Sequence, residues 1–317
     1  HGWPEPMAEA FIAATPAVEW VAKWLATGAQ RRVLALTDPQ YPWLLRQIAS
    51  PPLVLFVDGA FQDLSALQLA IVGSRQYAPA SGAWLAAQMP ALADAGLVIT
   101  SGLARGVDAL AHQAALDCGL PTLAVVGTGP DLVYPAVNRR LAARIREQGA
   151  IISELLPGTP AKPDHFPRRN RIISGLARGV LVLAAAERSG SLITAQQAAD
   201  QGRDVFAVPG APGNPLAYGC NYLIQQGAKL VMTAADITEE WGIGGALQCA
   251  PVTGKTALPS PGLLDSVGDE PTAVDLIAAR SGWPMTKVMQ ALLELELSGL
   301  ITAVAGGYQR LRRTDDV

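Results

Sequence analysis

One short segment of this chain gathers the residue types that bind phosphate groups and unpaired bases. It reads PDHFPRRNRIISGLA over residues 163–177, and an aromatic residue stands just ahead of three arginines and an asparagine: Phe166, Arg168, Arg169, Asn170 and Arg171. A guanidinium group bonds phosphate in a bidentate fashion, and an aromatic ring offers a face on which a base can stack. The structural alternative is a charged turn ahead of a buried helix, and this segment alone does not separate the two.

A second candidate is the turn after the first strand expected in the central domain. Gly73, Ser74 and Arg75 form this turn, and its free backbone N–H groups together with the arginine could hold a phosphate. A dinucleotide-binding site would need GxGxxG here and an acidic residue at the end of the next strand, whereas that strand ends at Thr100-Ser101. The turn therefore argues against nicotinamide chemistry, and the simpler alternative is an ordinary strand-to-helix turn.

The next glycine-rich turn, SGLARGVDALAH, covers residues 101–112 and offers Gly102 and Arg105. Asp108 and His112 follow four residues apart on one helical face. Such a pair could bind a metal ion or act as a base and its orienting group, but no third ligand follows. We therefore interpret it as a carboxylate at a helix N-terminus beside a partly buried histidine.

The remaining turns supply more polar groups without a convincing nucleophile. The turn GTGPDLVYPAVNRR begins at residue 127 and ends in polar and basic residues: Tyr134, Asn138, Arg139 and Arg140. Ser191 lacks the G-x-S-x-G setting of a nucleophilic serine. These groups predict a binding protein with no catalytic residue, no metal site and no cofactor.

The distribution of charge is more informative than its total. The formal net charge is −3, yet residues 139–178 carry nine basic and three acidic residues. Such a local excess is the electrostatic footprint of an anion-binding surface. Residues 266–317 have the opposite balance, with five basic and seven acidic residues, which argues against a grip on duplex DNA there.

Composition predicts a compact protein without a membrane segment. Half of the 317 residues are hydrophobic and 16% are charged, which is typical of globular chains. No apolar run approaches the roughly 18 residues of a membrane span. The three cysteines are scattered and form no CxxC pair, which fits a reducing cytoplasm and argues against structural zinc or disulfides. The chain starts at His1 rather than at methionine, which leaves room for residues before it.

Between residues 61 and 240, apolar runs alternate with alanine-rich segments of helical length. Continuous Val/Ile/Leu runs indicate strands buried on both faces, and their alternation with helices indicates parallel βαβ units. We predict an α/β fold with a Rossmann-like, doubly wound, mostly parallel sheet. In such sheets ligands bind at the carboxyl ends of the strands, where the glycine-rich turns are expected.

The flanking regions predict smaller parts. Residues 1–60, with a Trp-rich amphipathic helix, suggest a small helical domain, and residues 241–265 have the glycine and proline content of a linker. Residues 266–317 show two helices and then a hairpin, the order found in a winged helix. Its second helix carries Gln290, Glu294 and Glu296 beside Lys287, which favours contact with a protein over contact with a duplex.

The motifs GSR, SGLARGVDALAH, GTGPDLVYP, FPRRNRIISGL, ERSGSLITA, GRDVFAVPG and YGCNYLIQQGA, in this order, resemble the DNA-processing protein A family (DprA, also called Smf). The resemblance covers at least residues 40–240. It implies a domain that binds single-stranded DNA, protects it after uptake and loads the RecA recombinase onto it in natural transformation. It also implies a homodimer through the Rossmann-like domain, with neither a known catalytic activity nor a cofactor. The N-terminal region resembles the family's sterile-alpha-motif-like domain, and residues 266–317 its optional winged helix.

The resemblance and the residue chemistry together assign roles. Arginine and lysine side chains would neutralise phosphates, and Phe166 would stack a base. Backbone N–H groups at Gly73–Arg75 and Gly102 would fix the register of the DNA strand on the protein. Arg139 and Lys162 occupy places where family members commonly carry basic residues. The predicted DNA-binding set is Gly73, Ser74, Arg75, Gly102, Arg105, Asn138, Arg139, Lys162, Phe166, Arg169, Asn170 and Arg171.

Two alternatives remain at this point. The first is an enzyme similar to the lysine-decarboxylase-like phosphoribohydrolases, which carry a PGGxGT-type phosphate loop. This chain has Val208-Pro209-Gly210-Ala211 instead, without the second glycine and the threonine. Release of a base from nucleoside monophosphates would identify that enzyme. The second alternative is a protein-binding adaptor, which predicts no DNA binding.

Overall fold

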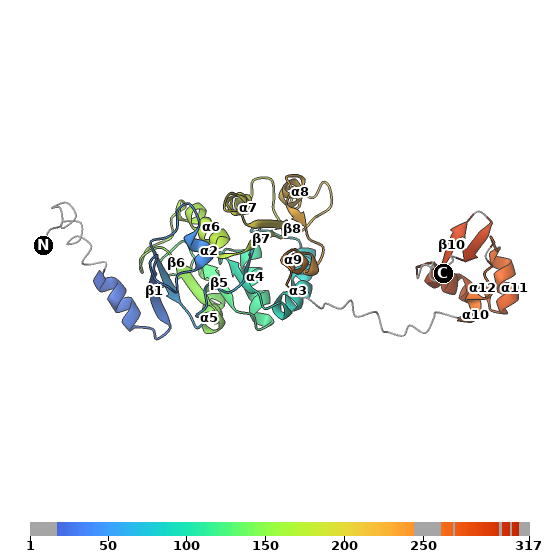
Figure 1. Cartoon of the computed structure of the whole chain (residues 1–317), viewed down its shortest axis with the longest axis horizontal. Coiled ribbons are helices and arrows are strands. Elements are labelled where there is room, and N and C mark those ends of the chain that lie inside the picture. Colours follow the sequence, from blue (N-terminus) through green and yellow to red (C-terminus); the bar gives the residue numbers. More distant parts are fainter. Residues whose placement is uncertain (1–17, 244–260, 269, 298–299, 305, 311–317) are drawn as a thin grey trace. The chain divides into compact units, whose positions relative to one another are not determined.

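The computed structural model describes residues 18–243, 261–268, 270–297, 300–304 and 306–310. The chain divides into two compact units, residues 1–244 and residues 245–317 (Figure 1). Most of the linker predicted over residues 241–265 lies outside the described residues. No helix in the described ranges is both long and apolar enough to cross a bilayer.

The first unit is built on one nine-stranded sheet with the strand order β1-β2-β6-β5-β4-β3-β7-β8-β9. Strands β3 to β9 run parallel, whereas β1 and β2 are antiparallel to their neighbours. The bounds are β1 Arg31–Ala35, β2 Val54–Asp58, β3 Gln68–Val72, β4 Val98–Ser101, β5 Thr122–Val125, β6 Ala150–Ser153, β7 Gly179–Val182, β8 Asp204–Ala207 and β9 Lys229–Leu230. The predicted mostly parallel α/β sheet is thereby confirmed.

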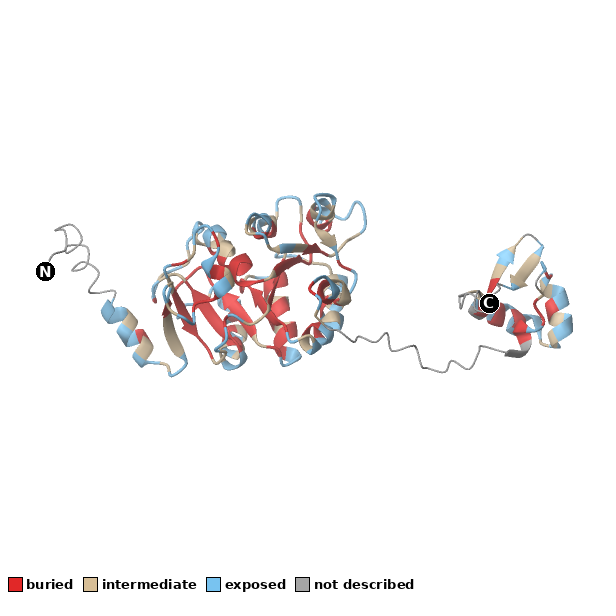
Figure 2. Ribbon diagram, in the orientation of Figure 1, coloured by how far each residue is buried: buried red, intermediate tan, exposed pale blue. Residues whose placement is uncertain are grey.

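The central strands are buried on both faces, as their uninterrupted apolar sequences predict (Figure 2). All five residues of β3 are buried. Leu69 and Ile71 belong to one core cluster, and Ala70 and Val72 belong to the other. Since successive side chains of a strand point to opposite faces, one short apolar run supplies both cores.

Helices cover both faces. Helices α2, α6, α7 and α8 contribute to the core that holds Ala70, and α3, α4 and α9 contribute to the core that holds Leu69. Helix α5 packs with α4 and β6 in a further cluster. The helix bounds are α2 Trp43–Arg46, α3 Pro79–Asp94, α4 Val107–Asp117, α5 Arg139–Gln148, α6 His165–Leu176, α7 Gly190–Asp200, α8 Tyr218–Gln225 and α9 Ala235–Glu240, with a short 3-10 helix at Ala136–Asn138.

The predicted boundary of an N-terminal helical domain at residue 60 is wrong. Residues 18–26 are helical, but β1 and β2 belong to the main sheet, where Val57 of β2 pairs with Ile152 of β6. Leu34 and Leu55 are buried in the main core, and Trp24 packs edge-on against Phe56 at a ring distance of 5.9 Å. The physical reason is the amount of apolar surface that is buried. By joining the edge of the large sheet, these strands bury more apolar surface than a separate domain of about 60 residues could.

The described residues of the second unit form two helices followed by a β-hairpin, after a short leading helix. The elements are α10 Pro261–Leu264, α11 Val274–Ser281, α12 Met285–Leu297, β10 Ile301–Val304 and β11 Gly307–Arg310. Ile277 of α11 packs in one cluster with Val288 and Leu292 of α12. Helix α11 ends at Gly282, whose φ of 67° is the left-handed conformation that glycine adopts freely.

Candidate nucleic-acid interface

The loops that follow the parallel strands meet at one edge of the sheet, because parallel strands all end there. Backbone hydrogen bonds join these loops. The N–H of Ser74, after β3, donates to the carbonyl of Ala184, after β7, at 2.7 Å, and Val107 N donates to Ser74 O at 3.1 Å. The turn that carries Arg75 is therefore held between the end of β7 and the start of α4.

Gly106 allows this close approach. Its φ of 84° and ψ of −130° lie in a region open to glycine alone. A Cβ at this position would lie 2.4 Å from the carbonyl oxygen of Ser74 and 2.5 Å from the Cα of Arg75. Only a glycine at position 106 lets the two turns meet.

Four of the predicted cations are exposed on this edge. Arg75 follows β3, Arg105 follows β4, Arg139 begins α5 after β5, and Lys162 lies between β6 and α6. None of the four forms an ion pair with the residues that the structure describes. Their charges are consequently available to an external anion.

Arg169 does not belong to this exposed set, which corrects the prediction that it contacts phosphate. Its side chain is only 5% exposed. The guanidinium donates to the carbonyl of Gly102 at 2.6 Å and to the carbonyl of Val125, while its Nε donates to Asn170 Oδ1 at 3.2 Å. Arg169 thus connects α6 to the ends of β4 and β5, and it holds the loops that follow these two strands in position.

The burial of Arg169 is offset by a carboxylate on the same side of the Gly102 turn. Asp108 accepts hydrogen bonds from the backbone N–H groups of Gly102 at 3.2 Å and Ala104 at 3.4 Å. Burial raises the pKa of Asp108, and the charge of Arg169 opposes that rise. Burial lowers the pKa of Arg169 to about 10, so the guanidinium remains charged at neutral pH. A Cβ on Gly102 would lie 2.6 Å from both groups, so this position also requires glycine.

Several other basic residues of the 139–178 segment are already paired. Arg171 forms an ion pair with Glu154 at 2.5 Å, Arg144 with Asp117 at 2.9 Å, and Arg146 with Asp58 at 2.7 Å. The local excess of positive charge offered to a ligand is therefore smaller than the residue count predicts. Arg171 is half-buried and already paired with Glu154, so it offers less charge to an external phosphate than its predicted role assumes.

The uncharged members of the predicted set shape the loops. Asn138 is buried and donates to the carbonyl of Leu103 at 2.9 Å, which joins the β5 loop to the β4 loop. Ser74 Oγ accepts from the N–H of Gln76 at 3.2 Å. A Cβ on Gly73 would lie 2.7 Å from a methyl group of Val107. These residues fix the loop geometry, whereas their backbone groups remain candidates for contact with a ligand.

Phe166 lies at the first turn of α6, half-buried, beside the β5 loop. Its ring centroid is 5.5 Å from that of Tyr134, with the planes inclined by 37°. A Cβ on Gly127 would come within 3.0 Å of the Phe166 ring, so glycine leaves room for that ring. The exposed Tyr134 extends this aromatic surface, a role that sequence reasoning did not assign to it.

The predicted DNA-binding set leaves out Arg168, and the signal that could have separated it from Arg169 is helical periodicity. Arg169 shares its face of α6 with the buried residues Ile172, Ile173 and Leu176, at the i, i+3, i+4 and i+7 spacing of a core stripe. Arg168 is on a different face and is exposed, although both arginines line a small cavity beside His165 and Glu154. The exposed arginine of the RR pair is the first one.

His112 is fully buried on α4, which agrees with its interpretation as a core histidine. The hydroxyl of Thr122 donates to the carbonyl of Ile99 at 2.7 Å, so the imidazole Nδ1–H must donate to Thr122 Oγ1, also at 2.7 Å. Nε2 is then a buried acceptor without a partner among the described residues. Burial, aided by the charge of Arg169, lowers the pKa of His112 to about 3.

Acid is therefore expected to destabilise the first unit through His112. The unfolded state takes up a proton near pH 6.5, whereas the folded state resists it down to about pH 3. The contribution of neutral His112 to the free energy of unfolding is fully present above pH 6.5. It falls as the pH drops, by at most about 1.4 kcal/mol per pH unit. Asp108, whose pKa is raised, contributes with the opposite sign.

Urea denaturation of the parent and of His112→Gln between pH 7 and pH 4.5 checks this prediction. Asp108 is present in both proteins, so its effect cancels in the difference. The variant should show a flatter dependence of unfolding free energy on pH than the parent. Parallel pH curves for the parent and His112→Gln would contradict the prediction.

Both units match known sequence families. Residues 32–242 match the family described as DNA recombination-mediator protein A, and residues 251–307 match the family described as DprA winged helix domain. The chain is 48% identical to Protein Smf of Escherichia coli K12 over 282 residues, which cover 86% of this chain and 75% of that protein. It is 45% identical to the DNA processing protein DprA of Streptococcus pneumoniae over 207 residues, 65% of this chain and 73% of that one.

Solved structures agree with these matches. The X-ray structure of DNA processing protein A from Streptococcus pneumoniae superimposes with a TM-score of 0.64 and 44% identity, covering 66% of this chain and 74% of that one. DNA processing protein A from Helicobacter pylori, whose structure describes its single-stranded DNA binding mode, gives a TM-score of 0.60 at 28% identity. That match covers 67% of this chain and 95% of that one.

Proposed function

The chain belongs to the DNA recombination-mediator protein A family, and from this membership we propose that it binds single-stranded DNA across the loops at the carboxyl edge of its sheet. The observation that supports this proposal is a row of exposed cations on successive loops, which form no ion pair with the described part of the chain. Arg75, Arg105, Arg139 and Lys162 come from the loops after β3, β4, β5 and β6, which are neighbours in the sheet. Arg168 adds a fifth charge at the start of α6.

A single strand suits this surface better than a duplex does. Arginine and lysine side chains neutralise phosphates whatever the sequence, and the Phe166–Tyr134 ring pair gives an unpaired base a surface to stack on. In a duplex the base faces are occupied by neighbouring pairs, so only the phosphate contacts would remain. The expected preference for single strands therefore depends on the aromatic pair.

Gel shifts over a salt series with single- and double-stranded oligonucleotides test the proposal. Arg75→Ala should weaken single-strand binding for all sequences, because a phosphate contact reads no base. The loss of one contact should flatten the plot of log affinity against log salt by about 0.7.

Lys229→Ala is a suitable control, since Lys229 begins β9, at the amino edge of the parallel strands, where it pairs with Glu240 at 2.6 Å. This variant should bind DNA like the parent. Equal affinities for Arg75→Ala and the parent at every salt concentration would remove Arg75 from the interface. Equal affinity of the parent for single and double strands would contradict the single-strand preference.

The wider role that we propose follows the family resemblance. The protein would bind incoming single-stranded DNA, protect it and deliver it to the RecA recombinase in the cytoplasm during DNA uptake. It would act as a homodimer through the Rossmann-like domain and without catalytic turnover. Recovery of unaltered oligonucleotides, together with faster RecA assembly on DNA in the presence of this protein, would support the proposal. Cleaved DNA, or an unchanged RecA assembly rate, would contradict it.

For the second unit we propose contact with a protein rather than with a duplex. On α12 the exposed side chains include Met285, Met289 and Leu293, which are 43%, 47% and 56% exposed. The neighbouring cation, Lys287, lies 4.1 Å from the centre of the Trp283 ring. A helix that reads the major groove would instead present several residues that bond phosphates and base edges.

A further inference from the structure

The N-terminal helix, residues 18–26, places an exposed tryptophan beside the loop that follows β6. Trp20 is 61% exposed, whereas Trp24 on the same helix is 5% exposed. A Cβ on Gly158 of the β6 loop would lie 3.3 Å from Cζ3 of the Trp20 ring, so the ring stands against the loop backbone. Gly158 also has a φ of 80°, a conformation that glycine adopts freely. Glycine at this position therefore permits both the turn and the contact with the ring.

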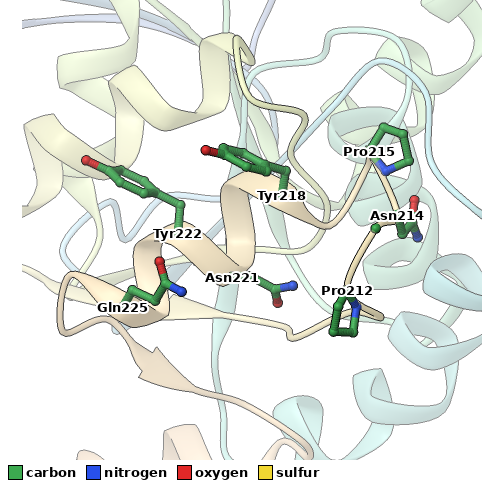
Figure 3. Close-up of a pocket in the computed structure, with 8 residues that line it drawn as sticks. Pro212, Asn214, Pro215, Tyr218, Asn221, Tyr222 and Gln225 are labelled. Atoms are coloured by element: carbon green, nitrogen blue, oxygen red, sulfur yellow. The ribbon is translucent and has the colours of Figure 1, made fainter.

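This surface lies at the β6 side of the row of cations. Trp24 packs edge-on against Phe56 of β2, and β2 is the neighbour of β6 in the sheet (Figure 1). The pocket lined by Tyr218 and Tyr222 of α8 lies toward the other end of the sheet, at β8 (Figure 3). The row of cations follows β3, β4, β5 and β6, so Trp20 adjoins the row at the end that faces away from α8.

Hydrogen bonds join the β6 loop to the loop that follows β5. Asp131 of the β5 loop accepts from the N–H of Gly158 with both carboxylate oxygens, at 2.8 Å and 3.0 Å. The N–H of Gly129 donates to the carbonyl of Thr159 at 2.8 Å. The β5 loop also carries Tyr134, whose ring pairs with that of Phe166. Two bonded loops thus hold the tryptophan and the proposed base-stacking pair on one surface.

The two loops also expose apolar side chains. Leu132 of the β5 loop is 38% exposed and Leu156 of the β6 loop is 41% exposed. Their loops approach closely, since a Cβ on Gly129 would lie 2.6 Å from the carbonyl oxygen of Leu156. The surface that continues from the Phe166–Tyr134 pair toward Trp20 therefore suits the flat, uncharged faces of bases.

The charge beside the tryptophan comes from the β6 loop. On the helix itself, Lys23 and Glu19 are both exposed and form no ion pair with the residues that the structure describes, so their charges offset each other. Lys162 is exposed on the same loop as Gly158, four residues further along the chain. A strand whose phosphate meets Lys162 has an aromatic ring on either side of that loop, Phe166 at the start of α6 and Trp20 on the helix.

We propose that Trp20 is a further base-stacking site, which binds bases of the same single strand where it continues past Lys162 toward the N-terminal helix. This inference rests on the proposed function. Aromatic rings stack on bases of any type, and tryptophan has the largest ring system among the side chains. The alternative role of Trp20 is to fasten the helix to the β6 loop, and it becomes one outcome of the test.

The test measures affinity for an oligonucleotide series of about 4 to 16 nucleotides. Trp20→Ala should leave the binding of the shortest oligonucleotides unchanged, because these fit on the cations and the Phe166–Tyr134 pair. It should weaken the binding of the longer ones by about five- to 150-fold for the lost stack. The salt dependence should stay that of the parent, because stacking displaces no counterions. Trp20→Phe keeps a ring and should keep most of the affinity.

Trp43 supplies the matched control, because it is 62% exposed. It begins α2, and the carbonyl of the next residue, Leu44, accepts from Arg203 at 2.8 Å. Arg203 precedes β8, so Trp43 lies toward the amino edge of the parallel strands, away from the cations. Trp43→Ala should bind oligonucleotides of every length like the parent.

Crosslinking gives a second measurement that does not depend on affinity. Oligonucleotides that carry 5-iodouracil, irradiated with the parent protein, should form adducts at Trp20 only when they are long enough to pass Lys162. Mass spectrometry of the digested protein identifies the crosslinked residue.

Parent-like affinity of Trp20→Ala for every oligonucleotide would overturn the inference, and so would the absence of adducts at Trp20 with long oligonucleotides. An equal loss of affinity at all lengths, together with a lower free energy of unfolding, would show that Trp20 only fastens the helix. A changed sedimentation mass of Trp20→Ala would assign the ring to a contact between copies of the chain. These results differ from failure of the proposed function, in which the parent binds no single strand and Arg75→Ala changes nothing.

Discussion

Replacing Arg169 with alanine is expected to lower the free energy of unfolding of the first unit by about 3–5 kcal/mol, because a buried cation that interacts with the buried Asp108 is removed. The carboxylate of Asp108 would remain buried without its cation. The carbonyl groups of Gly102 and Val125 would each lose a donor. Urea denaturation at pH 7 measures the effect, and any loss of single-strand affinity should accompany this loss of stability.

The adjacent arginine supplies the matched control. Arg168 is exposed, so Arg168→Ala should change stability by no more than about 0.5 kcal/mol while it weakens single-strand binding. Adding Asp108→Asn to Arg169→Ala should recover part of the lost stability, because an amide tolerates burial without a cation. Full stability of Arg169→Ala, together with weaker DNA binding, would show instead that Arg169 faces the ligand.

Gly106→Ala should impair DNA binding as strongly as Arg75→Ala does, although it removes no charge. A Cβ at position 106 would lie 2.5 Å from the Cα of Arg75, so the Arg75 turn must move. The backbone of Gly106, with φ 84° and ψ −130°, lies outside the left-handed helical region, so a side chain there should also destabilise the first unit by more than the roughly 1–2 kcal/mol of a left-handed residue. Titration with a single-stranded oligonucleotide and thermal unfolding measure the two effects separately.

A substitution at Gly96 is the control that separates backbone destabilisation from displacement of the Arg75 turn. Its φ is 70°, but a Cβ there would have no neighbour within 4 Å, and it precedes β4 at the opposite edge of the sheet. Gly96→Ala should therefore destabilise the protein by roughly 1–2 kcal/mol and leave DNA affinity unchanged. If Gly106→Ala binds DNA like Gly96→Ala, the position of the Arg75 turn does not limit binding.

Much of the architecture could be predicted from local patterns. Runs such as Leu69–Val72 read as doubly buried strands, and their alternation with helices fixed the parallel sheet and placed the glycine-rich turns at its carboxyl edge. The pairing of the first 60 residues could not be predicted in this way. Strand β2 joins β6 across nearly one hundred residues of sequence, and such pairing depends on which sheet edge is free.

The candidate site also has features that the sequence predicts and features that depend on the tertiary structure. Residue types alone indicated phosphate and base binding, because guanidinium groups and aromatic rings carry that chemistry wherever they stand, and the order of the motifs indicated the family. Which arginines are available was settled only by packing. Arg168 and Arg169 are neighbours in sequence, yet one meets solvent and the other meets carbonyl groups from two distant strands. Whether a charged side chain is buried depends on partners that the fold brings together from distant parts of the chain. The residues next to it in the sequence do not reveal those partners.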